Sequence, residues 1–580
     1  MAIWHAPAAR RPKTHVRWIA GVVGALCVLL GAVLVAHPFR SVAVLVLLVA
    51  VGMAVAGLGE LASARASAMP RVALLVGVAW VVAGLLVILL PGVAIGTITV
   101  LAGVALIVAG VVDVVTGLRG AADQRVTVVV RGVAAVVFGV LALSWPDITE
   151  IVVAVVFGAR LVLVGVDLVA TAVRPGHGKR VLPRWTRTVA AVCALVVAVA
   201  LLVVSVRVHG AAPRPDAFYD PPSDAPTTPG LLLRSEPFTR GVPAGARAWR
   251  ILYTTTRDEG VPATASGLVL APENAPPGPR PVIAWAHGTT GATPGCAPSL
   301  AADPFGPGAI PAAAEVLARG WVVVATDYPG LGTAGPHPYL IGQGEARSVL
   351  DAVRAARHLG GVDLAERTVV WGHSQGGHAA LWTGILAPTY APQTNVLGVA
   401  ALAPASDLSG LVDNLGGLRQ ATVLAAYVIE SYSEIYPDVD YSAMVRPTAR
   451  LQAREMAGRC LTEPSITVTV MTSLLFDRPI WNGDPTSGAF GARLRENTPT
   501  GPIPAPLLVA QGGSDPLILP SVQDGYVRRR CATGGVVDHR TYPGRDHLGV
   551  VAPDSPLLPE LLAWTQDRLD NRPAPTTCPT

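Results

Sequence analysis

The residues whose types and spacing are best suited to catalysis form a Gly-x-Ser-x-Gly turn at positions 372–376, with Ser374 at its centre. An apolar run at 368–371 precedes this turn, and a helix-like stretch at 378–382 follows it. A strand that turns so sharply into a helix holds the serine hydroxyl clear of the sheet, at the positive end of the helix. The flanking glycines leave room for the strained backbone. The sequence therefore predicts that Ser374 is a nucleophile.

A serine hydroxyl becomes a good nucleophile near neutral pH only beside an imidazole that takes its proton and an acid that orients the imidazole. On a strand–turn–helix elbow, the acid and then the histidine follow the serine along the chain. Asp515 follows the apolar run 507–510, and His547 ends the loop after the last predicted strand. We predict these two residues as acid and base. Less suitable candidates, inside expected elements or too close to the base, are Asp524, Asp538, Asp546, His358, His373 and His539.

Acyl transfer also requires preorganised donors for the oxyanion that forms on the substrate. One donor is expected to be the backbone N–H of Gln375, the residue after the nucleophile. Two candidates exist for the second donor, Gly288 and Asp327, and each lies directly after a predicted strand. This chemistry requires no metal and no cofactor, and we expect neither.

The elements that must position these residues alternate between strand and helix. Helices are expected at 311–319 and 344–359, and an antiparallel hairpin at 248–256 and 266–271. Further strands are expected at 281–286, 321–326, 368–371, 396–402, 506–511 and 536–542. This alternation predicts a mostly parallel sheet covered on both faces, with active-site residues at the carboxyl ends of the strands.

The first 207 residues have a different character, because they contain seven apolar stretches. Each is close to the ~20 residues needed to cross a hydrocarbon layer of ~30 Å. The stretches cover residues 18–36, 41–59, 71–90, 93–117, 126–143, 149–173 and 188–206. We therefore predict an all-α transmembrane bundle over residues 1–207.

A regular spacing of glycine and proline divides the first six stretches into three copies of one helical hairpin. A glycine lies seven residues before each of three prolines, and another lies nineteen residues after it. The three sets are Gly31, Pro38 and Gly57; Gly84, Pro91 and Gly110; and Gly139, Pro146 and Gly165. A repeat of this kind indicates a duplicated unit. The pattern resembles the HdeD-type acid-resistance membrane family, whose members carry paired short helices.

Basic residues predict the orientation of these stretches. They gather before the first stretch and in alternate loops near 65–71, 119–125 and 174–187. The positive-inside rule places these loops and the N-terminus in the cytoplasm, so the seventh crossing delivers the rest of the chain outside the plasma membrane. Charges inside the stretches are interpreted as snorkelling or paired within the bundle, with no transport activity assigned. These residues are Asp113, Arg131, Arg160 and Asp167.

Composition limits the remaining possibilities. The net charge of +5 comes partly from the short basic loops, so we predict no nucleic-acid partner. The Pro-rich segment 208–230 is expected to be an extended spacer before the domain at 231–580. Outside the apolar stretches the chain has four cysteines, an even number that permits two disulfides in an oxidising compartment.

Residues from about 230 to the C-terminus resemble the secretory lipase family of α/β-hydrolases. The matching pieces are the turn at 327–330, the helix at 342–354, the elbow at 372–379, Ser514-Asp515, Cys531-Ala532, Tyr542-Pro543 and His547. The resemblance implies the triad Ser374, Asp515 and His547. It also implies Gln375 and Asp327 as oxyanion donors, although the His287-Gly288 pair departs from the family's prototype and keeps Gly288 in consideration.

The same resemblance implies two disulfides, Cys296–Cys460 and Cys531–Cys578, and a helical cap inserted at about 405–500. The expected function is a membrane-anchored, extracytoplasmic serine lipase or carboxylesterase that acts on triacylglycerol-type lipid esters. A short-chain esterase, a peptidase or an acyltransferase fits the same triad. From another class, the chain fits a non-enzymatic membrane stress protein whose outer domain binds lipid.

Overall fold

The computed structural model describes residues 14–36, single positions between 58 and 85, 91–119, 122–173, 184–209 and 213–579, apart from 275–276, 419–420 and 475–477. The chain divides into two compact units, one mainly before residue 208 and the other mainly after it. The second unit carries the predicted catalytic residues.

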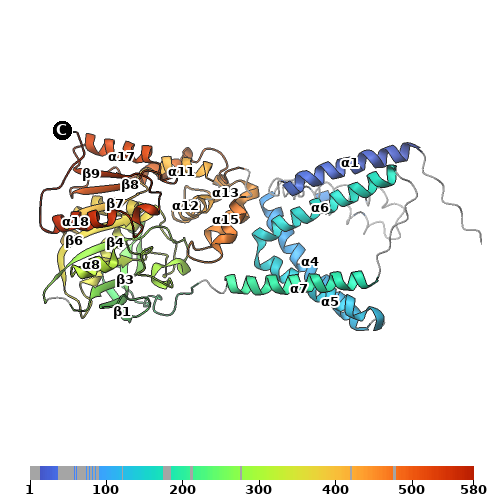
Figure 1. Cartoon of the computed structure of the whole chain (residues 1–580), viewed down its shortest axis with the longest axis horizontal. Coiled ribbons are helices and arrows are strands. Elements are labelled where there is room, and N and C mark those ends of the chain that lie inside the picture. The colour runs from blue at the N-terminus through green and yellow to red at the C-terminus, as the bar shows by residue number, and fades with distance from the viewer. Residues whose placement is uncertain are drawn as a thin grey trace, which may run out of the picture. The chain divides into compact units, whose positions relative to one another are not determined.

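A nine-stranded mixed sheet lies at the centre of the second unit, in the order β1-β2-β3-β5-β4-β6-β7-β8-β9 (Figure 1). The strands β1, β2, β3 and β5 pair antiparallel, and from β5 to β9 every neighbouring pair is parallel. The strands are β1 (Leu232–Phe238), β2 (Ala246–Thr256), β3 (Pro262–Pro272), β4 (Arg280–Ala286), β5 (Val322–Thr326), β6 (Leu364–His373), β7 (Val396–Leu402), β8 (Leu507–Gly512) and β9 (Val537–Tyr542).

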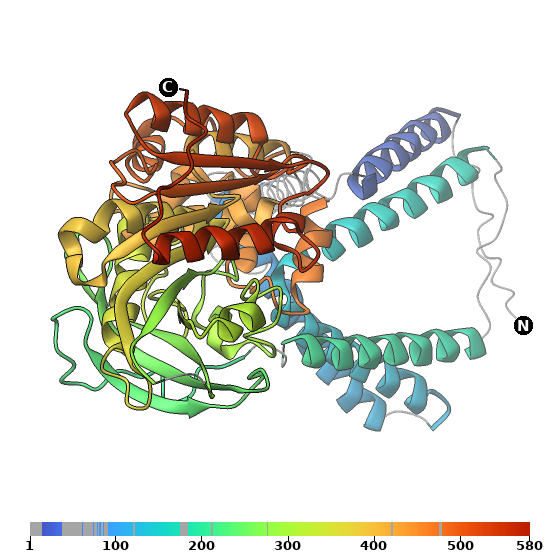
Figure 2. The same cartoon turned by 60° about the vertical axis from the view of Figure 1, so that its left-hand side comes forward.

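The predicted alternation of strands and helices is confirmed, and the sheet is covered on both faces. Parallel strands with two buried faces read as nearly continuous apolar runs, as β5 and β8 do. The helices α9 (Gly342–Ala356), α10 (Gln375–Tyr390) and α17 (Pro520–Ala532) pack on one face. On the other face lie α8 (Ala313–Ala318) and α18 (Leu557–Leu569), the red helix that crosses the sheet in Figure 2.

Strand β1 was not predicted from the sequence. Its side chains are mostly half-buried or exposed, and it includes Arg234, Glu236 and Pro237. A strand at the edge of a sheet needs no apolar pattern and tolerates proline, so its sequence carries little strand signal.

The chain between β7 and β8 forms a helical insertion. Its helices are α11 (Leu408–Gly417), α12 (Thr422–Ile435), α13 (Tyr441–Met444), α14 (Arg450–Ala457), α15 (Ile466–Leu474) and α16 (Gly488–Glu496). Both disulfides implied by the family resemblance are present. Cys296–Cys460 joins the loop after β4 to the insertion, and Cys531–Cys578 joins the end of α17 to the C-terminal tail.

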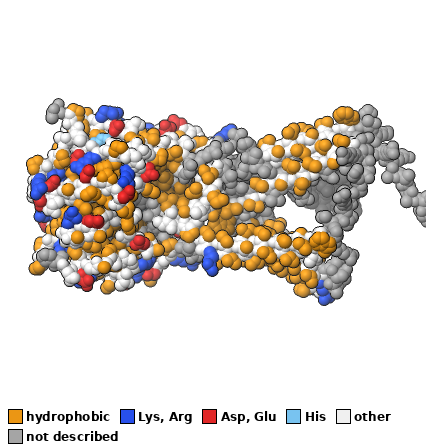
Figure 3. Space-filling model, in the orientation of Figure 1, with side chains coloured by type: hydrophobic (Ala, Val, Ile, Leu, Met, Phe, Trp, Pro, Cys, Tyr) orange, Lys and Arg blue, Asp and Glu red, His pale blue; other side chains and the backbone are white. Residues whose placement is uncertain are grey.

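The first unit is helical over the residues described. Its helices are α1 (Thr14–Ala36), α4 (Pro91–Arg119), α5 (Ala122–Ser144), α6 (Pro146–Val173) and α7 (Arg184–His209). They coincide with five of the seven predicted stretches, and the other two, 41–59 and 71–90, lie almost entirely outside the described residues. Within the described part, Arg125–Ser144 and Thr188–Val208 are long and apolar enough to cross a membrane. Figure 3 shows hydrophobic side chains along the surface of these helices.

Among the described helices of the first unit, the two most closely packed pairs join different copies of the repeat. Helix α4 packs against α5, and α1 packs against α6. A Cβ built at Gly110 would lie 2.6 Å from the carbonyl oxygen of Gly132, and one at Gly165 would lie 2.5 Å from that of Gly24. These two glycine pairs occupy equivalent places in the repeat, so the small residues serve contacts between copies. The two helices of a predicted hairpin are both described only in the third copy, where α5 packs less closely against α6 than against α4.

Candidate active site

Ser374 lies at the sharp turn between β6 and α10, with φ 58° and ψ −117°. A positive φ is uncommon for a residue with a side chain and marks a strained backbone that the surroundings must hold. A Cβ at Gly372 would collide with the carbonyl group of Gly376, and one at Gly376 with that of Ala286 at the end of β4. The two glycines therefore let the turn close tightly against the sheet.

The structure brings the three predicted triad residues together. The Nε2 atom of His547 lies 2.8 Å from Ser374 Oγ, and its Nδ1 atom lies 2.8 Å from Asp515 Oδ2. A carboxylate can only accept hydrogen bonds, so the Nδ1 atom of His547 carries the proton. Its Nε2 atom is therefore free to take the proton of Ser374. This is the hydrogen-bond chain by which a serine nucleophile is activated.

Asp515 is held in place by further donors from the loop after β8. Its Oδ1 atom accepts hydrogen bonds of 2.9 Å from the backbone N–H groups of Leu517 and Ile518, and Oδ2 accepts one of 3.2 Å from Gln511 Nε2. Burial pushes the pKa of Asp515 upward, but the hydrogen bond to His547 and these N–H donors outweigh it, so the pKa lies below its usual value. The carboxylate is ionised and fixed in orientation.

His373, a less suitable candidate for the base, supports the loop of His547 instead. Its Nε2 atom lies 2.9 Å from the carbonyl oxygen of His547 and donates to it, and the two rings are 4.9 Å apart. Burial lowers the pKa of His373 to about 3, so the ring is neutral. The residue before the nucleophile therefore ties the histidine loop to the elbow.

The two candidates for the second oxyanion donor differ in their surroundings. The backbone N–H of Asp327 donates to the carbonyl oxygen of Ser266 at 2.7 Å. Its carboxylate accepts from Ser266 Oγ, Ser299 Oγ and the Ser299 N–H at 2.6, 2.6 and 2.9 Å. These bonds leave Asp327 no donor for a substrate oxygen, contrary to the expectation from the resemblance. The backbone of Gly288 passes beside the nucleophile, since a Cβ built there would lie 3.7 Å from Ser374 Cβ.

A cavity of about 650 Å³ opens beside Ser374 and His547. Its wall combines residues of the sheet, the loop 298–311 and the helical insertion, and most of them are apolar. The principal apolar residues are Leu268, Trp285, Ile310, Leu424, Leu461, Leu517 and Leu548. A pocket of this size and character suits a mostly hydrocarbon ligand with a reactive polar group at one end.

Three buried histidines make the stability of this unit sensitive to acid. Burial lowers the pKa of His287 to about 4 and those of His337 and His373 to about 3. Between these values and the ordinary pKa near 6.5, only the unfolded chain binds the protons. The free energy of unfolding should therefore fall as the pH drops below about 6.5, by up to about 1.4 kcal/mol per histidine and pH unit.

Four carboxyl groups act in the opposite sense, because burial raises the pKa of Asp351 to about 6 and also raises the pKa values of Asp327, Glu430 and Glu434. We expect them to offset part of the effect of the three histidines. Urea unfolding followed at pH 7, 6 and 5 measures the net slope. A free energy of unfolding that stays level or rises toward pH 5 would contradict this account.

Comparisons with known proteins agree with this fold. Residues 311–577 match the family described as "Secretory lipase". The chain is 28% identical over 386 residues to "Probable inactive lipase MT1628" of Mycobacterium tuberculosis, covering 62% of this chain and 83% of that protein. It is 27% identical over 402 residues to "Lipase A" of Arthroderma benhamiae, covering 63% and 82%.

The closed-state crystal structure of Candida antarctica lipase A superposes with a TM-score of 0.53 at 21% identity, over 63% of this chain and 89% of the other. The second unit thus has the α/β-hydrolase fold, and the comparisons support a hydrolase of the lipase type. In the first unit, residues 22–73, 75–129 and 130–203 each match "Short repeat of unknown function (DUF308)". These three matches correspond to the three copies seen in the sequence.

Proposed function

We propose that this protein is a serine carboxylic-ester hydrolase that cleaves acyl-lipid esters. The observation that carries the proposal is the hydrogen-bond chain from Ser374 through His547 to Asp515, which opens onto an apolar cavity. One relative is named as a probable inactive lipase. In this chain all three triad residues are present and within hydrogen-bond distance, which favours an active enzyme.

The arrangement supports a two-step acyl transfer. His547 takes the proton of Ser374 as the hydroxyl oxygen attacks the ester carbonyl, and the oxyanion accepts from the backbone N–H of Gln375. We assign the second donor to Gly288, because the N–H and carboxylate of Asp327 are already engaged. The imidazolium then protonates the leaving alcohol. Water, activated by the same imidazole, releases the acid and restores the serine.

We propose a lipase over a short-chain esterase or acyltransferase because of the apolar cavity beside Ser374. Turnover of p-nitrophenyl esters should rise from acetate to octanoate, because each added methylene group of the acyl chain can be buried in the apolar cavity. Ala309→Phe, a change at a half-buried wall residue, should reduce octanoate turnover and leave acetate turnover nearly unchanged. Rates that fall steadily beyond about four carbons would instead support a short-chain esterase.

We further propose that the first unit anchors the enzyme in the plasma membrane, with the N-terminus in the cytoplasm and the hydrolase outside. The apolar stretches, the basic loops between them and the two disulfides all favour this arrangement. A membrane-impermeant fluorophosphonate applied to intact cells tests nucleophile and location together. Labelling is expected for the native chain and not for Ser374→Ala.

Two outcomes of that experiment would contradict the proposal in different ways. Labelling only after the cells are broken would place the hydrolase on the cytoplasmic side. No labelling even of the purified protein would favour the alternative, in which the outer domain binds lipid without hydrolysing it.

A further inference from the structure

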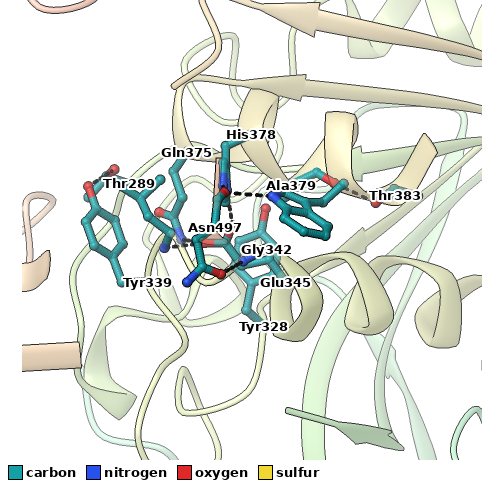
Figure 4. Close-up of polar contacts among 12 residues, drawn as sticks. Thr289, Tyr328, Tyr339, Gly342, Glu345, Gln375, His378, Ala379, Thr383 and Asn497 are labelled. Atoms are coloured by element: carbon teal, nitrogen blue, oxygen red, sulfur yellow. Dashed lines mark hydrogen bonds and ion pairs between the residues drawn. The ribbon is translucent and has the colours of Figure 1, made fainter. Parts of the chain in front are cut away.

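A cluster of buried polar side chains lies beside the nucleophile elbow and takes no part in the chemistry described above. Glu345 comes from α9, Gln375 and His378 from the first turn of α10, His337 from the loop before α9, and Asn497 from the segment after α16. None of these side chains is more than slightly exposed. Figure 4 shows Glu345, Gln375, His378 and Asn497 converging on one another. Buried polar groups are costly unless they are held by specific partners.

The side-chain amide of Gln375 has one orientation fixed by two acceptors. Its Nε2 atom donates to Glu345 Oε1 at 2.8 Å and to His337 Nε2 at 3.0 Å. The His337 ring can accept there because its Nδ1 atom donates to the carbonyl oxygen of Pro329 at 3.0 Å. The Oε1 atom of Gln375 is buried and has no partner among the described residues. A flipped amide would lose both donors, so this side chain cannot rotate without breaking the cluster.

Glu345 and His378 form the pair that supports this amide. The Oε2 atom of Glu345 lies 2.9 Å from His378 Nδ1, and the other ring nitrogen, Nε2, lies 2.8 Å from the carbonyl oxygen of Asn497. Both ring nitrogens of His378 are therefore held, one by Glu345 on α9 and the other by the backbone of Asn497. A buried polar contact of this kind adds little net stability, which favours a role in fixing geometry.

The helical insertion closes over the cluster. The side chain of Asn497 accepts from the backbone N–H of Gly342 at 3.0 Å and donates to Tyr436 Oη at 2.8 Å. From α12, Ser431 Oγ donates to the carbonyl oxygen of His337 at 2.6 Å. These contacts keep water away from the amide of Gln375, where water would compete for its donors.

We propose that Glu345 and His378 are positioning residues that act through the side chain of Gln375. Gln375 is the first residue of α10, where the backbone N–H has no acceptor within the helix. Holding its side chain from the opposite side fixes the first turn of the helix, so this N–H faces the substrate oxygen before the reaction begins. The inference rests on the ester hydrolysis proposed above.

The test compares Gln375→Met and Glu345→Leu with the native full-length chain. Both variants keep the backbone N–H of residue 375. Both lose the side-chain hydrogen bonds that orient this N–H. Loss of a whole oxyanion donor costs about 10²–10³-fold in kcat, so a misdirected donor should cost about 10–100-fold. KM should stay nearly constant. The affinity for an alkyl trifluoromethyl ketone, whose serine adduct carries the oxyanion, should weaken by the same factor as kcat.

Two further variants separate positioning from general loss of structure. Thr383→Val is a matched control in the same helix, because Thr383 is buried and donates only to the Ala379 carbonyl group one turn back. Its kcat and ketone affinity should match those of the native chain. Glu345→Gln, which keeps an acceptor for Gln375, should recover most of the kcat lost in Glu345→Leu. Titration with saturating fluorophosphonate counts the folded sites in each sample.

The outcomes distinguish the inference from the proposed function. If the native chain hydrolyses no ester, the proposed function fails and the positioning role fails with it. If the native chain is active but Gln375→Met and Glu345→Leu match Thr383→Val in kcat per folded site, only the positioning role is overturned. Equal losses in Glu345→Gln and Glu345→Leu would also overturn it.

Discussion

Replacing Ser374 by alanine should lower the turnover of p-nitrophenyl esters by about 10⁴- to 10⁶-fold, because it removes the hydroxyl that His547 Nε2 contacts and that forms the acyl intermediate. The fold should survive. The Oγ atom bonds to His547 Nε2, and the φ of 58° is as accessible to alanine as to serine. Turnover per folded molecule, measured beside thermal unfolding, checks both statements. Unchanged turnover would end the assignment of Ser374.

A buried serine outside the site provides the control for this substitution. Ser406 follows β7 and donates from Oγ to Gln523 Oε1 at 3.2 Å, and it is not one of the residues that line the cavity beside Ser374. Ser406→Ala should retain native turnover and lose only a small amount of stability, about 1 kcal/mol. A comparable loss of activity in both variants would point to misfolding.

Replacing Asp515 by asparagine should lower kcat by about 10⁴-fold with little change in KM. The reason lies in its hydrogen bonds. The backbone N–H groups of Leu517 and Ile518 require an acceptor, so the asparagine oxygen would occupy their side and its NH₂ group would face His547 Nδ1. The ring would then accept at Nδ1 and carry its proton on Nε2, where it could no longer take the proton of Ser374.

Asp538 provides the matched control for the substitution of Asp515. It is buried on β9 and pairs with Arg540 at 2.7 Å, so Asp538→Asn makes the same chemical change outside the triad. Steady-state kinetics on both variants should show the loss of kcat in Asp515→Asn alone. If Asp538→Asn were the inactive one, the acid would have been assigned to the wrong residue.

The placement of Ser374, Asp515 and His547 could be predicted because it depends on the order of strands along the chain. Each residue follows an apolar run, and parallel strands bring their carboxyl ends to the same edge of the sheet. Asp327 satisfied the same pattern, yet its N–H is used by Ser266 across the antiparallel pair β3–β5. Periodicity locates the end of a strand, but it does not show which N–H groups the neighbouring strand occupies.

The polar cluster around Gln375 could not be predicted from the sequence. Glu345 and His378 are 33 residues apart, and Asn497, near the end of the insertion, lies 119 residues beyond His378. A charged residue on the buried face of a helix was the one available signal, and Glu345 in α9 carries it. The pairing of α4 with α5 was missed for a related reason, since glycine spacing marks a close contact without naming the partner helix.

The bridge between Cys296 and Cys460 constrains how the enzyme can admit a bulky molecule. Cys460 is followed by Leu461 and Thr462 in the cavity wall, and the Leu461 N–H also donates to the Thr290 carbonyl oxygen at 2.8 Å. The loop after β4 and the insertion, which both line the cavity, are thereby joined covalently. The insertion cannot lift away as a free flap, because any widening of the cavity must take place around this fixed bond.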